Sequence, residues 1–160
     1  MATPLAIYVH DHLAGAAFAT DLLETLRDQH RGDPMGNFAA AMLVEVETDR
    51  TVLKRLADRV GSGSSPIKEA AAWLSEKVSR LKLGGDNDGL ATFEALEFLA
   101  LGVLGKLSLW KALREIAPME GRLRDLDFAT LIARALDQHS QLETHRLELA
   151  KKAFTNNSDS

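Results

Sequence analysis

The sequence contains no cysteine, and this absence excludes several classes of functional site. Disulfide bonds, thiolate nucleophiles, zinc fingers and iron–sulfur clusters all depend on cysteine side chains. No apolar run reaches the roughly 18 residues that a membrane-spanning helix needs. The stretch from Met1 to Leu5 also lacks the basic start of a signal peptide. We therefore expect a soluble, cytoplasmic protein with no membrane partner.

The chain has no excess of positive charge. Its 160 residues include 19 Lys and Arg against 23 Asp and Glu, which gives a formal net charge of −4. No stretch concentrates basic side chains on one face, so we expect no nucleic-acid partner. The apolar fraction of 46% and the charged fraction of 26% are ordinary for a globular protein, and the length favours one domain with its own core.

Proline is scarce, with 4 residues in 160, and the prolines and some of the 11 glycines fall where helices are expected to begin and end. Three pairs place a capping side chain before a proline at the first helical position: Thr3-Pro4, Asp33-Pro34 and Ser65-Pro66. Glycines at positions 32, 61 and 84 suit the left-handed residue that follows a helix, and Asp125 can cap the last helix. The predicted helices cover residues 4–31, 34–60, 66–83, 90–117 and 125–154.

Each predicted helix carries an apolar stripe at helical spacing, and no segment alternates with period two. The sequence therefore predicts an all-α protein with no sheet. We expect residues 1–154 to form a single domain and the polar tail, 155–160, to be disordered. In the predicted helix 90–117 the inner stripe consists of Phe93, Ala100, Leu104, Leu107, Trp110 and Leu113.

The lengths of the connections predict the topology. Short turns near Gly32 and near residues 118–124 make two antiparallel hairpins of long helices. About 30 residues, including the shorter helix 66–83, lie between the hairpins, which is enough to carry the chain back along the bundle. Helices 34–60 and 90–117 should therefore run parallel. The expected fold is a four-helix bundle of two antiparallel hairpins joined by a long crossover.

With this architecture the chain resembles the ferritin-like superfamily over residues 4–154. Metal-binding members of that superfamily place a Glu on each of two helices and a Glu-x-x-His on each of the other two. Glu45 and Glu143 match the glutamates of the second motif, whereas Thr48 and Arg146 stand where its histidines would be. Glu97 supplies a glutamate from helix 90–117. The resemblance implies a ferritin-like fold. It also implies that a metal bound at these glutamates would be iron or manganese.

Counting turns along the predicted helices places Glu45, Glu97, Glu143 and Arg146 in one layer of the bundle. Glu97 lies in the most apolar stretch of the chain, so we expect it to be buried and paired with Arg146 or a histidine. On that expectation, Glu97→Ala should cost about 3 kcal/mol. The full predicted inner polar cluster is His12, Glu45, Asp49, Glu97, His139, Glu143 and Arg146.

Two functional hypotheses follow from this cluster. In the first, Arg146 neutralises the carboxylates, and the protein is non-catalytic, binds no metal or other cofactor, and acts through assembly or partner binding. In the second, it is a non-haem iron or manganese carboxylate protein, an oxidase or a storage protein, with Glu45, Glu97, His139 and Glu143 as ligands. The sequence does not decide between them, and it identifies neither a catalytic residue nor a small-molecule ligand.

The predicted helix 90–117 also carries a second apolar face, formed by Phe98, Leu101, Gly102, Gly105 and Leu109. The crossover helix, with Trp73 beside its own stripe, can cover part of this face. If the face is left uncovered, it would exceed the apolar patch that a monomer usually tolerates. A two-fold homodimer is the simplest way to bury it.

Overall fold

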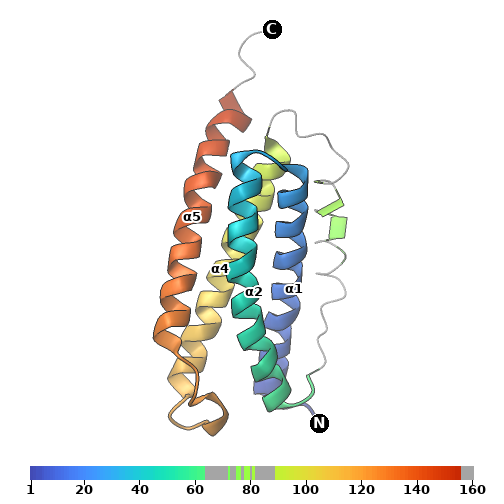
Figure 1. The fold of residues 1–160 in the computed structure, drawn as a ribbon. Coiled ribbons are helices and arrows are strands. Elements are labelled where there is room, and N and C mark those ends of the chain that lie inside the picture. The colour runs from blue at the N-terminus through green and yellow to red at the C-terminus, as the bar shows by residue number, and fades with distance from the viewer. Residues whose placement is uncertain (64–71, 73–74, 77, 80, 82–88, 156–160) are drawn as a thin grey trace.

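The computed structural model describes residues 1–63, 72, 75, 76, 78, 79, 81 and 89–155. These residues form four long helices, α1 (Pro4–Gln29), α2 (Pro34–Val60), α4 (Leu90–Ile116) and α5 (Phe128–Thr155), with a short 3-10 turn, η1 (Gly121–Leu123), before the last (Figure 1). The described residues contain no strand. The prediction of an all-α four-helix bundle is confirmed.

The N-caps at the first two helices form as their sequences predict. Thr3 Oγ1 accepts a hydrogen bond of 3.2 Å from the Ala6 amide, and Asp33 Oδ1 accepts one of 3.1 Å from Gly36. The third predicted pair, Ser65-Pro66, lies outside the described residues. The last helix differs from the prediction, because Asp127 rather than Asp125 accepts from the backbone amide of its first turn, that of Thr130.

The path of the chain agrees with the predicted connections. In Figure 1, α1 rises from the N-terminus, α2 descends, α4 descends again and α5 rises. Helices α2 and α4 are therefore parallel, and residues 61–89 return the chain to the end at which α2 began. Most of the predicted crossover helix, 66–83, lies outside the described residues, and its six described positions are helical.

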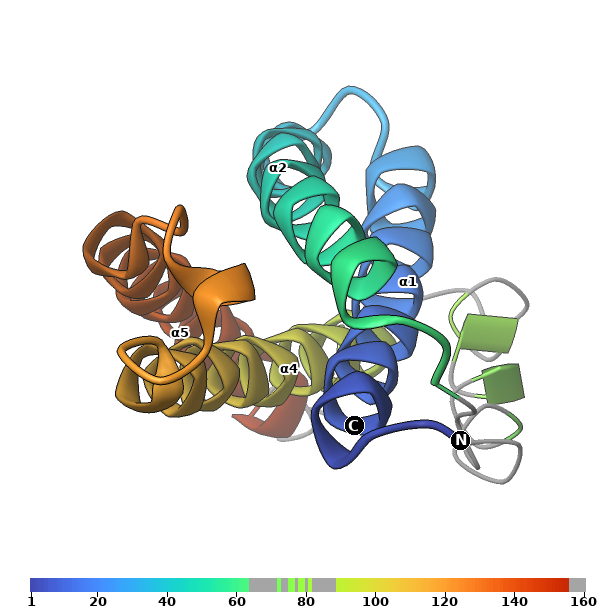
Figure 2. The same cartoon turned by 90° about the horizontal axis from the view of Figure 1, so that it is seen from below.

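The two hairpins are the tightly packed units of the bundle. Helices α1 and α2 pack closely together, as do α4 and α5, whereas contacts between α1 and α4 are much sparser. Seen along the bundle in Figure 2, the two pairs lie side by side. This uneven packing leaves room between the hairpins, on the side where α1, α2 and α4 meet.

Two leucines of helix α4 differ from their predicted positions. Leu104, assigned to the inner stripe, is 40% exposed, whereas Leu109, assigned to the outer face, is fully buried. The other predicted stripe residues are buried, among them Leu107 and Trp110. The error has a physical cause: α4 is apolar around most of its circumference, so its hydrophobic pattern does not define one direction toward the core.

Candidate functional site

Arg146 on α5 is the centre of a partly exposed ion cluster. Its guanidinium donates to Glu143 at 2.7 Å and to Glu97 on α4 at 2.9 Å. The predicted partnership of Glu97 with Arg146 is therefore confirmed. The predicted burial is wrong, because the Glu97 side chain is 49% exposed. The hydrogen bond from Arg146 lowers the pKa of Glu143, and the charge of His139 contributes more weakly in the same direction.

The buried ion cluster lies elsewhere, around Asp49 on α2. The Asp49 side chain is only 2% exposed, and its two oxygens receive donors from two other helices. Lys106 Nζ on α4 donates to Oδ2 at 2.7 Å, and Arg134 Nε on α5 donates to Oδ1 at 2.7 Å. Gln138 Nε2 adds a hydrogen bond of 3.2 Å to Oδ2. Asp49 thus joins α2, α4 and α5.

Gln138 extends this cluster to Glu45. Its amide nitrogen donates to Glu45 Oε2 at 3.2 Å, while its carbonyl oxygen accepts from Lys106. We call Asp49, Lys106, Arg134, Gln138 and Glu45 the Asp49 cluster, and Arg146, Glu97 and Glu143 the Arg146 cluster. Burial lowers the pKa of Lys106, even though the charge of Asp49 acts in the opposite direction.

The predicted single polar layer is therefore divided between two places. Glu45 and Asp49 belong to the Asp49 cluster, and Glu97, Glu143 and Arg146 form the other. His12 on α1 belongs to neither: its ring packs edge-on against Tyr8, with ring centroids 4.8 Å apart, and burial lowers its pKa. The four residues proposed as metal ligands do not form one set. Within the described ranges, no three His, Asp or Glu side chains converge to hold a metal ion.

Three members of the Asp49 cluster were missed from the sequence, although a signal was available for two of them. Gln138 falls between Leu131, Ala135 and Leu142 at the 4-3-4 spacing of an inner stripe. Lys106 stands three residues after Val103 and four before Trp110, which is again an inner position. A polar side chain at an inner position needs a partner. Asp49 has the same spacing on α2, between Val46 and Leu53.

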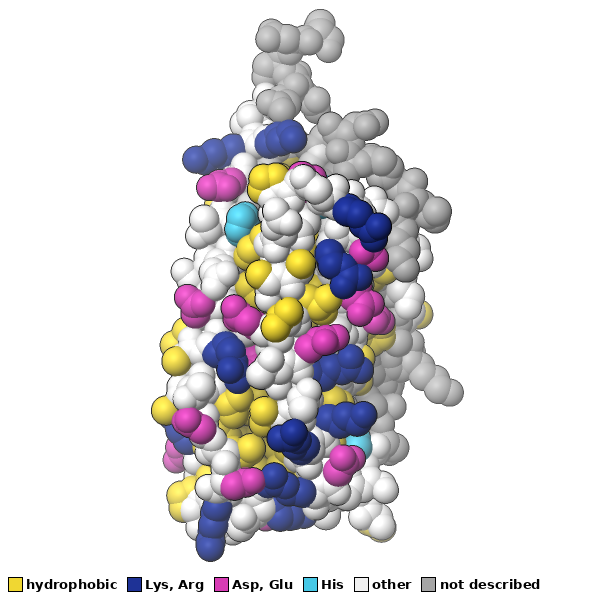
Figure 3. Space-filling model, viewed as in Figure 1, with side chains coloured by type: hydrophobic (Ala, Val, Ile, Leu, Met, Phe, Trp, Pro, Cys, Tyr) yellow, Lys and Arg dark blue, Asp and Glu magenta, His cyan; other side chains and the backbone are white. Residues whose placement is uncertain are grey.

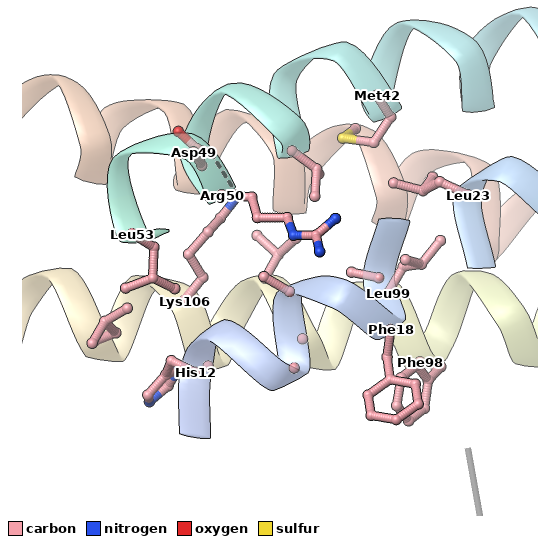
Figure 4. Close-up of a pocket in the computed structure, with 18 of the residues that line it drawn as sticks. His12, Phe18, Leu23, Met42, Asp49, Arg50, Leu53, Phe98, Leu99 and Lys106 are labelled. Atoms are coloured by element: carbon pink, nitrogen blue, oxygen red, sulfur yellow. Dashed lines mark hydrogen bonds and ion pairs between the residues drawn. The ribbon is translucent and has the colours of Figure 1, made fainter. Parts of the chain in front are cut away.

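A cavity of about 350 Å³ lies next to the Asp49 cluster, lined mainly by α1, α2 and α4, with Leu142 of α5. In Figure 4, His12, Asp49 and Lys106 lie toward one end of the cavity, Arg50 lies near its middle, and the labelled side chains of the other end are apolar. The polar residues are Asp11, His12, Asp49, Arg50 and Lys106. The apolar residues of the opposite end include Phe18, Leu23, Met42, Phe98 and Leu99.

Two buried polar atoms, in residues that also line the cavity, have no hydrogen-bond partner in the described part of the chain. They are Nε1 of Trp110, whose side chain is fully buried, and Oδ1 of Asp11. An unpartnered buried polar atom costs on the order of 1–3 kcal/mol, so native proteins contain few. Both residues belong to the lining of the same cavity.

The second apolar face predicted for α4 is largely the wall of this cavity. Phe98, Gly102, Gly105 and Leu109 all line it, and only Leu101 of that set points away, with 62% exposure. On the face shown in Figure 3, side chains of both charge signs are interspersed with small groups of hydrophobic ones. None of the described helices combines the length and apolarity needed to cross a bilayer.

Comparison with known proteins identifies no relative: no protein-family model, no curated protein and no solved structure matches the chain.

Proposed function

We propose that this protein is a non-catalytic, metal-free helical bundle that acts by binding, with the cavity between α1, α2 and α4 as its binding site. The observation that carries the proposal is the cavity itself. It has about 350 Å³ of space, an apolar end, and the charged side chains of Asp11, Arg50 and Lys106 in its lining. Concave, mostly apolar sites with a few polar groups are typical of small-molecule pockets.

Three glycines in the cavity lining support this proposal. Gly15 on α1 and Gly102 and Gly105 on α4 lie inside helices, and a Cβ added at any of them meets no atom of the described residues within 4 Å. Alanine at such a helical position would stabilise the protein by about 0.5–1 kcal/mol. Close packing against the described residues therefore does not explain these glycines. An open cavity explains them, because any side chain there would narrow it.

The Asp49 cluster supports the non-catalytic part of the proposal. Both oxygens of Asp49 accept from cationic or amide donors, and Glu45 accepts from Gln138. Lys106 and Arg134 supply the positive charge that a metal would bring. Elemental analysis of protein purified without chelator or affinity metal tests this. We expect far less than one iron, manganese or zinc per chain, and stoichiometric metal would overturn the proposal.

The binding site can be tested with naphthalene, a neutral apolar probe small enough for the cavity. Binding is followed by the Nε1–H resonance of Trp110 in nitrogen-15 NMR spectra. Gly105→Leu should abolish binding, since the new side chain fills the cavity without a steric clash at Cβ. The matched control is Ala112→Leu, at an exposed position of the same helix outside the cavity lining. Unchanged binding by Gly105→Leu would exclude the cavity as the site.

Self-association is a second candidate, favoured by two exposed leucines on α4. Leu101 and Leu104, at 62% and 40% exposure, lie three residues apart on one side of the helix. We propose that they form the centre of a two-fold homodimer. Light scattering at micromolar concentration should then give a dimer for the native chain and a monomer for Leu101→Lys. A native monomer of 17.5 kDa would overturn this. Trp73, predicted to share this surface, lies outside the described residues.

Membership of the ferritin-like superfamily and a cytoplasmic location stay predictions. What supports the first is the path of the chain, two antiparallel hairpins with α2 parallel to α4. The second rests on the sequence alone.

A further inference from the structure

We infer that the ligand of the cavity is an amphipathic monoanion, in the simplest case a medium-chain carboxylate whose carboxylate group binds Arg50. This inference rests on the proposed binding function of the same cavity. It names the chemical class of the ligand and the residue that recognises its charged end. Three observations carry it: the environment of Arg50, the saturation of Asp49, and the division of the cavity into a polar and an apolar end.

Arg50 on α2 directs its guanidinium into the cavity (Figure 4). The structure gives it one hydrogen bond, from NH1 to Thr20 Oγ1 at 3.2 Å, and no acidic partner in the part of the chain that it describes. Other arginines of the bundle differ, since Arg134 and Arg146 each donate to a carboxylate. A guanidinium has five N–H donors and keeps its charge at any physiological pH. Most of the donors of Arg50 therefore remain for a ligand.

The nearest acid in sequence, Asp49, does not neutralise Arg50. Its Oδ2 accepts from Lys106 and Gln138, and its Oδ1 accepts from Arg134. With Glu45 included, the Asp49 cluster contains two carboxylates, one ammonium and one guanidinium, so its formal charge is zero. Arg50 forms no ion pair with a described carboxylate, although Asp11 in the same lining balances its formal charge. A planar monoanion that accepts two parallel N–H bonds is the ligand group that fits a guanidinium best.

The cavity continues from Arg50 toward an apolar end. In Figure 4, the side chains of Leu23, Met42 and Leu99 lie on one side of Arg50, and those of His12 and Lys106 lie on the other. A cavity of ~150 Å³ holds benzene, so the volume of about 350 Å³ suits a ligand of roughly twice that size. Decanoate, with about twelve non-hydrogen atoms, fits this limit and combines an anionic end with an apolar chain.

Asp11 offers the opposite recognition chemistry. Its side chain belongs to the cavity lining, and a carboxylate accepts from a cationic or hydroxyl ligand. Arg50 is the stronger determinant because its guanidinium points into the cavity, whereas Oδ1 of Asp11 is a buried atom. The binding experiment therefore compares three ligands with the same chain length: decanoate, decylammonium and 1-decanol.

Binding of these ligands at pH 7 is measured by titration calorimetry and by the Trp110 resonance. We expect decanoate to bind at least about tenfold more tightly than 1-decanol, as hydrogen bonds to charged groups imply. Arg50→Gln should remove this advantage and leave the 1-decanol affinity within about twofold, while Arg50→Lys should keep part of it. Arg55→Gln is the matched control, at an exposed arginine of the same helix outside the cavity lining.

Several results would overturn the inference while leaving the proposed function intact, provided that naphthalene still binds and Gly105→Leu still blocks it. They are equal affinity for decanoate and 1-decanol, tighter binding of decylammonium, and unchanged decanoate affinity in a folded Arg50→Gln variant. If Arg50→Gln does not fold, the inference is tested by the relative affinities of decanoate, decylammonium and 1-decanol for the native chain. Failure of naphthalene and of all three decyl ligands to bind would overturn both proposals.

Discussion

Two ion clusters connect the helices of this bundle, and they differ mainly in burial. In the Asp49 cluster the central carboxylate is 2% exposed and is held by side chains of α4 and α5. In the Arg146 cluster the carboxylate of Glu97 is 49% exposed, and the pairs link only α4 and α5. The chemical groups are nearly the same in both, a carboxylate with a guanidinium.

The comparison shows that the surroundings, rather than the groups, set the energetic weight of an ion pair. An exposed pair gains little, because water and salt screen the charges and each side chain loses conformational freedom. A buried pair adds little net stability as a whole, yet removing one partner leaves a charge without compensation. The Asp49 cluster should therefore tolerate loss of its central carboxylate, which two cations share, much less well than the Arg146 cluster tolerates loss of Glu97.

The largest effect is expected for Asp49→Ala. This change leaves Lys106 and Arg134 without their shared carboxylate, so unfolding free energy should fall by about 3–5 kcal/mol. Asp49→Asn should cost less, because its amide keeps an acceptor oxygen. Urea denaturation at pH 7 measures both, and Asp58→Ala, at an exposed acid of the same helix, is the control. A loss below about 1 kcal/mol for Asp49→Ala would contradict the contrast between the clusters.

A much smaller effect is expected for Glu97→Ala. Arg146 keeps its hydrogen bonds to Glu143, and the exposed Glu97 carboxylate contributes as a surface ion pair does. The loss of stability should therefore be under about 1 kcal/mol, in place of the about 3 kcal/mol expected for a buried residue. The same denaturation series measures it. A cost as large as that of Asp49→Ala would show that exposure is not what distinguishes the clusters.

The fold could be predicted from the sequence because its signals are local. Thr3 and Asp33 cap helices where the proline pairs indicate. The short turns and the long connection specify two hairpins with parallel α2 and α4. The capping of α5 shows the limit: Asp125 suits the role locally, but it forms an ion pair with Arg59, at 2.6 Å, and Asp127 caps instead. A partner 66 residues away in sequence cannot be read from the local pattern.

The site was only partly predictable, for two physical reasons. The direction of α4 depends on its neighbours, since its pattern is apolar on nearly every side, and this misplaced Leu104, Leu109 and the burial of Glu97. The cavity arises from loose packing between hairpins, which no single helix encodes. In contrast, the inner position of Gln138 was available from its 4-3-4 spacing and was overlooked.

The pH dependence of the unfolding free energy tests the contribution of the Arg146 cluster separately. The hydrogen bond from Arg146 lowers the pKa of Glu143 below its ordinary value of 4.5. The resulting stability is present above pH 4.5 and is lost as the pH falls through the lowered pKa. The difference in unfolding free energy between the native chain and Arg146→Met should therefore shrink on acidification below that pH. Urea denaturation at several acidic pH values measures it, and a constant difference would contradict this role of Arg146.

The smallest effect at neutral pH is expected for Lys106→Met, even though Lys106 lies in the buried cluster. Asp49 keeps Arg134 and Gln138, and the variant no longer buries an ammonium group, so the change at pH 7 should stay within about 1 kcal/mol of zero.

The dependence of the stability on pH in the alkaline range is more informative. Burial lowers the pKa of Lys106 below its ordinary value of 10.5, so between these two values the unfolded chain binds more protons than the folded one. Stability conferred by this group therefore rises with pH in that interval. Lys106→Met lacks this rise, so the native chain should gain stability relative to the variant as the pH approaches 10.5. Lys111→Met, at an exposed lysine of the same helix, should follow the native chain. Parallel profiles for the native chain and Lys106→Met would show that the folded protein does not penalise the ammonium group, and the contrast between the two clusters would then rest on Asp49 alone.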